Sequence, residues 1–125
     1  DVTLVSWGKI MKVALQAAED LEKEGISVEV IDLRTIRPLD YDTILESVKK
    51  TNRLVILEES WPFASISTEI TYMVQQKAFD YLDAPIKRIT TPDASAPYSA
   101  PLFAEWFPKV EKVKEEIKNA LYIKA

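Results

Sequence analysis

The stretch Val28–Asp40, which reads VEVIDLRTIRPLD, contains a strand, a loop and the start of a helix in direct succession. Its first five residues are mostly apolar and β-branched, which is typical of a strand buried on both faces of a parallel sheet. Pro38 lacks a backbone donor and therefore ends regular strand pairing, and Asp40 stands where a helix N-cap is expected. We predict that the strand Ser27–Leu33 lies at the centre of the sheet.

The same order of strand and helix occurs on either side of this stretch. Apolar runs over residues 2–7 and 54–57 predict two more buried strands, and apolar residues at helical spacing predict helices over 9–24 and 41–50. Gly25 fits the left-handed cap that ends the first of these helices. Because strand–helix–strand occurs twice, we expect a parallel sheet with helices on both faces.

The second half of the chain continues this order less regularly. A third helix is expected from Ser65 or Ser67, with Phe79 extending its buried stripe, and a fourth strand over Ile86–Thr90 alternates apolar and charged residues, which is typical of an edge strand. Thr91–Trp106 predicts a long loop, and loops of this length are usually functional or packed against another surface.

A last helix is expected to begin near Pro108, with Val110, Val113, Ile117 and Leu121 on its buried face. The predicted fold class is α/β, in three α/β/α layers around a mostly parallel sheet of four to five strands. We expect residues 1–125 to form a single domain.

The composition excludes several classes of function. The chain has no cysteine, no histidine, two glycines and a net charge of −4. Serine–histidine and cysteine–histidine catalysis are therefore impossible with these residues alone, and two glycines cannot build a phosphate-binding loop of the GxGxxG or Walker type. We expect no nucleic-acid partner, because phosphate binding needs a basic face, and no membrane span, because no apolar run is long enough.

Charged residues at the predicted turns leave more than one interpretation open. Glu58 and Glu59 follow a buried strand, where paired carboxylates can perform acid–base chemistry, but without a histidine or metal partner a structural role is favoured. Lys9 can contact an anion at a helix start, although a solvated lysine is favoured. Arg34 and Arg37 suit either an anion or a contact with another subunit.

Large aromatic residues gather at the turns. They are Trp7, Trp61, Phe63, Trp106 and Phe107. Aromatic side chains are enriched in protein–protein interfaces, and five of them exceed what a small core covers easily. We therefore favour a protein–protein interface over simple packing against the core as the role of these aromatic residues.

Five blocks of the sequence resemble a known family in order and spacing. They are DVTLVSWGK, EGISVEVIDLRTIRPLD, LVILEESWP, FDYLDAPIKRIT and PDASAPYSAPL. They resemble the C-terminal domain of the β subunit of the pyruvate dehydrogenase component, in the family of thiamine-diphosphate-dependent 2-oxo acid dehydrogenases. This domain type is shared with transketolase, so the resemblance implies a transketolase C-terminal-like fold.

The resemblance also implies a parent enzyme of two α and two β subunits. That enzyme decarboxylates pyruvate on thiamine diphosphate and reductively acetylates the lipoyl group of the acyltransferase. Thiamine diphosphate and magnesium lie between the α subunit and the N-terminal domain of β, so no cofactor is expected in this chain. We expect a fragment that is inactive alone, from the mitochondrial matrix of a eukaryote or the cytoplasm of a bacterium.

The family's C-terminal domain packs against the second β subunit and binds the peripheral subunit-binding domain of the acyltransferase. The resemblance places the docking acid on Asp93 and the terminal isoleucine on Ile123, which Lys124 and Ala125 extend. The loop reads Thr91-Pro92-Asp93 where the family usually has Gly-Ala-Asp. The candidates for the subunit interface are Trp7, Arg34, Arg37, Trp61 and Phe63.

Two other interpretations remain at the level of sequence. One is the corresponding domain of a transketolase-like, 1-deoxyxylulose-phosphate synthase or branched-chain 2-oxo acid dehydrogenase enzyme. The other belongs to a different class, a stand-alone flavodoxin-like module that binds an anion. The sequence ESWP at residues 59–62 does not suit the sugar-phosphate enzymes. The shortage of glycine does not suit the anion-binding module.

Overall fold

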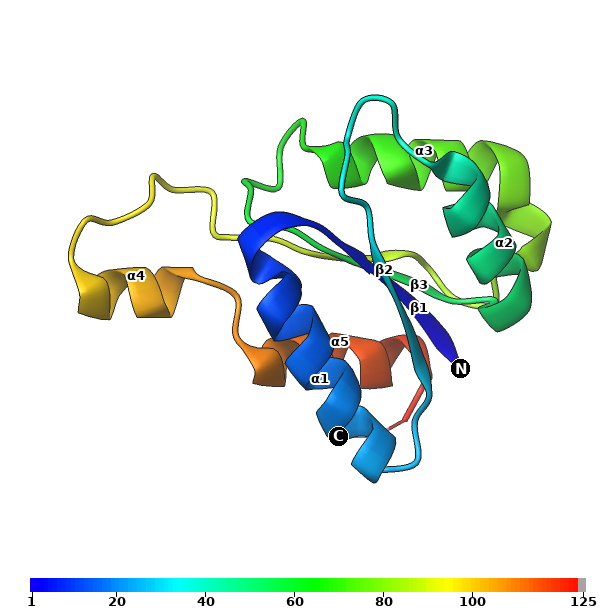
Figure 1. The fold of residues 1–125 in the computed structure, drawn as a ribbon, viewed down its shortest axis with the longest axis horizontal. Coiled ribbons are helices and arrows are strands. Elements are labelled where there is room, and N and C mark those ends of the chain that lie inside the picture. The colour runs from blue at the N-terminus through cyan, green and yellow to red at the C-terminus, as the bar shows by residue number, and fades with distance from the viewer. Residues whose placement is uncertain (124–125) are drawn as a thin grey trace.

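A computed structural model describes residues 1–123 as a four-stranded parallel sheet between two layers of helices (Figure 1). The strands run in the order β2-β1-β3-β4, and every neighbouring pair is parallel. Their bounds are β1 (Val2–Ser6), β2 (Val28–Asp32), β3 (Leu54–Leu57) and β4 (Lys87–Ile89). The predicted α/β class and the three layers are confirmed, and no strand within residues 1–123 is antiparallel.

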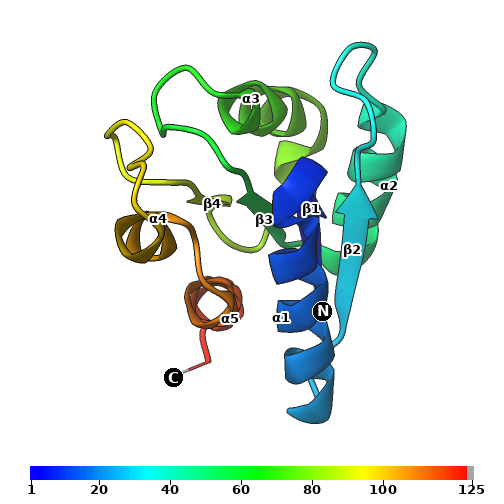
Figure 2. The same cartoon turned by 60° about the vertical axis from the view of Figure 1, so that its left-hand side comes forward.

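Two helices cover each face of the sheet (Figure 2). The helices α1 (Met11–Lys23) and α5 (Val110–Ala120) pack on one face, and α2 (Tyr41–Thr51) and α3 (Ile66–Ala78) pack on the other. Short 3₁₀ turns over Gly8–Ile10 and Phe79–Tyr81 precede α1 and follow α3. No helix among the described residues is long and apolar enough to cross a membrane.

The two central strands separate the core into two clusters. In β1, Val2 and Leu4 face α1 and α5 while Val5 faces α2 and α3; β3 alternates in the same way. Because successive side chains of a strand point to opposite faces, a run that is apolar throughout supplies both clusters. All residues of β1 and β3 are buried.

The prediction that Ser27–Leu33 is the central strand is wrong. The crossover through α1 carries the chain to one side of β1, and the crossover through α2 returns it to the other side, so β2 is an edge strand. Every residue of β2 is only partly buried. Its apolar positions contact both clusters, which explains why the sequence looks like that of a central strand.

The turns around the helices follow the sequence closely. Asp40 caps α2, since its Oδ1 accepts a hydrogen bond from the Thr43 amide at 3.0 Å, and hydrogen bonds from Thr43 lower the pKa of Asp40. Gly8 and Gly25 have positive φ of 71° and 82°, a conformation that glycine adopts without steric cost. At both turns the chain can therefore change direction between a strand and a helix within a few residues.

Other expectations differ from the structure in detail. Phe79 does not extend the buried stripe of α3, because the chain tightens into a 3₁₀ turn there and leaves the ring 65% exposed. The predicted loop Thr91–Trp106 contains a short helix, α4 (Ala100–Trp106), which lies beyond the end of the sheet (Figure 1). The last helix begins at Val110, two residues after Pro108, and buries Val113 and Ile117 as predicted.

Candidate functional site

The parallel sheet brings most of the candidate residues to a single edge. Trp7 follows β1, Arg34 and Arg37 follow β2, and Trp61 and Phe63 follow β3, so all five lie at the carboxyl edge of the sheet. Asp93 follows β4 at the same edge. In open parallel sheets this edge is where binding sites form. We call these connections, together with α4, the carboxyl-edge surface.

Ile123 lies at the opposite edge. Helix α5 spans 11 residues, roughly 16 Å, and returns the chain to the amino edge, where Arg53 Nε donates to the Ala120 carbonyl just before β3. The Ile123 amide donates to the Lys118 carbonyl at 3.0 Å, and its side chain is 43% exposed. One copy of the chain therefore does not bring Asp93 and Ile123 together. Lys124 and Ala125 lie outside the described residues.

The segment that carries Asp93 is hydrogen-bonded to the loop between β3 and α3. The Thr91 amide and hydroxyl both donate to the Ser60 carbonyl, at 3.0 and 2.9 Å. The Ala94 carbonyl accepts from two indoles, Trp61 Nε1 at 2.8 Å and Trp106 Nε1 at 3.0 Å. Asp93 lies between these anchors with its side chain exposed to solvent.

The neighbouring acids Glu58 and Glu59 point to different environments. Glu58 is fully buried, and its carboxylate accepts from the amide of Ser67 at 3.2 Å and from the Ser67 hydroxyl. Glu59 is exposed to solvent. The two carboxylates do not form a pair, so they provide no acid–base couple, and the favoured structural interpretation describes Glu58.

Arg88 completes the contacts around Glu58 and was not identified from the sequence. It donates from Nε to the Ser67 hydroxyl at 2.6 Å, and from Nη2 to the Pro62 carbonyl at 2.6 Å and the Ser65 hydroxyl at 2.9 Å. Its Nη2 lies 3.9 Å from Glu58 Oε1. The only signal in the sequence was an arginine in a predicted edge strand, which is too common to be informative.

The remaining candidates for an interface differ in how much they expose. Phe63 is 84% exposed and Trp61 51% exposed. Trp7 is partly buried and packs against the α2–α3 cluster, so most of its surface closes the core. Arg37 and Arg34 are both exposed, and Arg34 forms an ion pair with Asp32 at 2.6 Å.

Lys9, at the start of the first helical turn, contacts aromatic rings. Its Nζ lies 5.0 Å from the ring centre of Phe103 and 5.3 Å from that of Phe107, a distance at which a cation is attracted to the ring face. This contact joins the 3₁₀ turn before α1 to α4 and to the residue that follows α4. The interpretation of Phe107 as an interface residue is therefore weakened, because its ring already has a partner within the chain.

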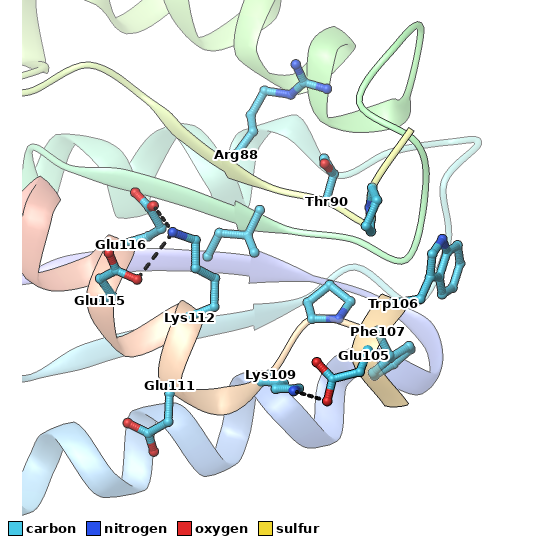
Figure 3. Close-up of a pocket in the computed structure, with 13 residues that line it drawn as sticks. Arg88, Thr90, Glu105, Trp106, Phe107, Lys109, Glu111, Lys112, Glu115 and Glu116 are labelled. Carbon is cyan, nitrogen blue, oxygen red and sulfur yellow. Dashed lines mark hydrogen bonds and ion pairs between the residues drawn. The ribbon is translucent and has the colours of Figure 1, made fainter. Parts of the chain in front are cut away.

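A pocket of about 520 Å³ lies beside the open edge of β4, between that strand and α5 (Figure 3). Ile89, Pro92, Trp106 and Phe107 supply much of its wall. The charged residues of its rim largely pair with one another: Lys109 with Glu105 at 2.9 Å, and Lys112 with Glu116 and Glu115 at 2.9 and 3.2 Å. The hydrogen bonds to Glu116 and Glu115 raise the pKa of Lys112.

The described residues do not fit a site for thiamine diphosphate and magnesium. Within residues 1–123, no group of three or more acidic side chains is placed to hold a metal ion. The buried carboxylate of Glu58 is occupied by Ser67, and Arg34, at the same edge, is paired with Asp32. We therefore derive no chemical step through that cofactor in this chain.

Comparison with known proteins identifies the fold family. The family model described as "Transketolase, C-terminal domain" matches residues 1–113. The chain belongs to the transketolase C-terminal domain family. It is 52% identical over 98% of its length to the pyruvate dehydrogenase E1 component subunit beta of Rhizobium meliloti, and 51% identical over 98% to subunit beta-1, mitochondrial, of Oryza sativa subsp. japonica.

The chain spans only part of these relatives. It covers 26% of the Rhizobium protein, 33% of the rice protein and 38% of the corresponding subunit of Rickettsia bellii, to which it is 48% identical. The resemblance to pyruvate dehydrogenase β subunits is thus confirmed along almost the whole chain, including the blocks that carry the candidate residues.

Solved structures support the same fold. A split-gene transketolase, described as an inactive beta4 tetramer, superimposes with a TM-score of 0.81 and 26% identity; the match covers all of this chain and 40% of that one. A 2-oxoglutarate:ferredoxin oxidoreductase from Magnetococcus marinus gives a TM-score of 0.64 at 14% identity, over 97% of this chain and 18% of that one. The second match concerns the fold alone.

The contrast between Glu58 and Glu59 gives a direct test of the buried contacts. Replacing Glu58 by Ala leaves Arg88 and Ser67 without their carboxylate, so we expect the free energy of unfolding to fall by about 3 kcal/mol. The matched change Glu59→Ala removes an exposed carboxylate and should alter it by less than about 0.5 kcal/mol. Urea unfolding followed by circular dichroism measures both. Equal effects would contradict the structural role of Glu58.

Proposed function

We propose that this chain is the assembly and docking domain of a pyruvate dehydrogenase β subunit. In the parent enzyme, two α and two β subunits decarboxylate pyruvate on thiamine diphosphate with magnesium and reductively acetylate the lipoyl group of the acyltransferase. This chain supplies surfaces for other proteins, namely the α subunit, the second β subunit and the peripheral subunit-binding domain of the acyltransferase.

The observation that carries the docking proposal is that Asp93 is exposed on a segment whose backbone is hydrogen-bonded on both sides of it. The carboxylate is exposed, but the backbone on either side is held by Ser60, Trp61 and Trp106. A charge presented on an ordered backbone loses less conformational entropy on binding than a charge on a loose loop. A basic group of the subunit-binding domain is the complementary partner, because a carboxylate pairs best with arginine or lysine.

Ile123 is proposed as a separate contact with the same partner. It lies at the amino edge of the sheet and shares no hydrogen bond with the carboxyl-edge surface; its amide is bound to Lys118. An Ile123→Ala variant should therefore weaken docking independently of Asp93. If the two effects prove strongly coupled, Ile123 is not a separate contact.

The docking role of Asp93 is tested by Asp93→Ala in the assembled enzyme of α and β subunits. We expect the dissociation constant for the isolated subunit-binding domain, measured by calorimetry, to rise at least about tenfold, because the partner's cation loses its carboxylate. Glu46→Ala is the matched control, since Glu46 is an exposed acid in the middle of α2, which packs on the face of the sheet opposite α5. Unchanged affinity in Asp93→Ala would refute the assignment.

The second part of the proposal is that the carboxyl-edge surface contacts another β subunit. Phe63, 84% exposed, and Arg37, which is also exposed, belong to it. A large exposed ring at the end of a strand favours association, and the related split-gene transketolase was solved as a beta4 tetramer. Trp7 remains a candidate with less free surface, and Arg34 remains an exposed candidate whose guanidinium is paired with Asp32.

Light scattering of this chain over a range of concentrations tests the association. We expect the average mass to rise above 14.2 kDa as concentration increases, and Phe63→Ser to shift this rise to a severalfold higher concentration. Tyr72→Ser removes another exposed ring, 55% exposed on α3, and should leave the curve unchanged. A chain that stays monomeric at millimolar concentration contradicts the interface.

A further inference from the structure

We propose that Trp61 and Trp106 are positioning residues for Asp93, and that the buried contacts of Glu58 and Arg88 fix Trp61 in place. This inference rests on the docking role proposed for Asp93. It assigns the two indoles to holding the docking segment from within the chain, whereas the exposed surface of Trp61 alone suggests an interface residue.

The first step is the shared acceptor. The Ala94 carbonyl, next in sequence to Asp93, accepts from Trp61 Nε1 at 2.8 Å and from Trp106 Nε1 at 3.0 Å. The two indoles come from the loop after β3 and from the last residue of α4. A carbonyl bound from two sides has its peptide plane, between residues 94 and 95, fixed. The Ala94 amide in turn donates to the Pro92 carbonyl at 2.8 Å, which closes a tight turn around Asp93.

The second step concerns what holds Trp61. Arg88, in β4, donates to the Pro62 carbonyl directly after Trp61 and to the hydroxyl of Ser65 at the end of the same loop. Its third bond goes to Ser67, which also donates to the fully buried Glu58. A guanidinium reaches such a set of acceptors because its donors form a rigid fork.

The third step is the backbone of this loop. Ala64, between Trp61 and Ser65, has a positive φ of 50°, a conformation that costs free energy for any residue with a side chain. Strained residues persist where the surrounding structure over-determines them. The bonds from Arg88 on both sides of Ala64, at Pro62 and Ser65, supply that constraint.

The remaining step joins the two loops. Besides the indole of Trp61, the amide and hydroxyl of Thr91 donate to the Ser60 carbonyl. These hydrogen bonds therefore couple the position of the Asp93 segment to that of the loop after β3. In this pair of loops, Glu58 is the buried residue whose contacts fix the backbone, and Asp93 is the exposed residue.

Hydrogen exchange of this chain tests the positioning without any partner. In Trp61→Phe, which keeps an aromatic ring and removes the donor, we expect the amides of residues 91–99 to exchange about threefold faster, and about tenfold faster in Trp61→Phe/Trp106→Phe. The urea midpoint should not change. Tyr98→Phe removes a polar group from a fully exposed ring of the same segment and should leave exchange unchanged. Unaltered exchange in the double variant overturns the inference.

A double-mutant cycle in the assembled enzyme then distinguishes positioning from direct contact. Trp61→Phe should weaken binding of the subunit-binding domain about threefold when Asp93 is present and not at all in Asp93→Ala. An equal loss in both backgrounds overturns the inference, because Trp61 then contacts the partner itself. If Asp93→Ala alone has no effect, the docking proposal fails, and the exchange measurement still decides whether the indoles order the segment.

Discussion

The buried carboxylate of Glu58 is the constraint on which the carboxyl-edge surface depends. A charge removed from water costs several kcal/mol unless hydrogen bonds replace its hydration. Here the hydrogen bonds come from the amide and hydroxyl of Ser67, and Arg88 supplies an opposite charge at 3.9 Å. These groups must take up defined positions to satisfy the carboxylate, and in doing so they define the path of the loop between β3 and α3.

This constraint matters because the topology brings most candidates for recognition to the same edge of the sheet, with Ile123 as the exception. The central strands β1 and β3 end beside each other, and β4 ends next to β3. The connections that follow these strands therefore share one edge, and hydrogen bonds from Thr91 and Trp61 link two of them. Hydrogen bonds between the loops fix the backbone of this surface. The side chains proposed to bind other proteins, Phe63 and Asp93, remain exposed.

Periodicity predicted the layers, the parallel sheet and the helix cap at Asp40, because local patterns determine these features. It misplaced β2, since Val28, Val30 and Ile31 contact both clusters from an edge as they would from the centre. Helix α4 was missed because its seven residues include a proline and few polar residues. The pairing of Arg88 with Glu58 joins residues 30 positions apart, and no local pattern encodes such a contact.

Asp93, on a segment that Trp61 and Trp106 hold in position, is the proposed docking residue for the acyltransferase's subunit-binding domain. The most direct measurement is fluorine NMR of the assembled enzyme labelled with fluorotryptophan, with signals assigned by Trp→Phe variants, while that domain is added. We expect the signals of Trp61 and Trp106 to shift and the signal of Trp7, packed against the α2–α3 cluster, to stay unchanged. A shift of Trp7 alone, or no shift at saturating concentration, would contradict this proposal.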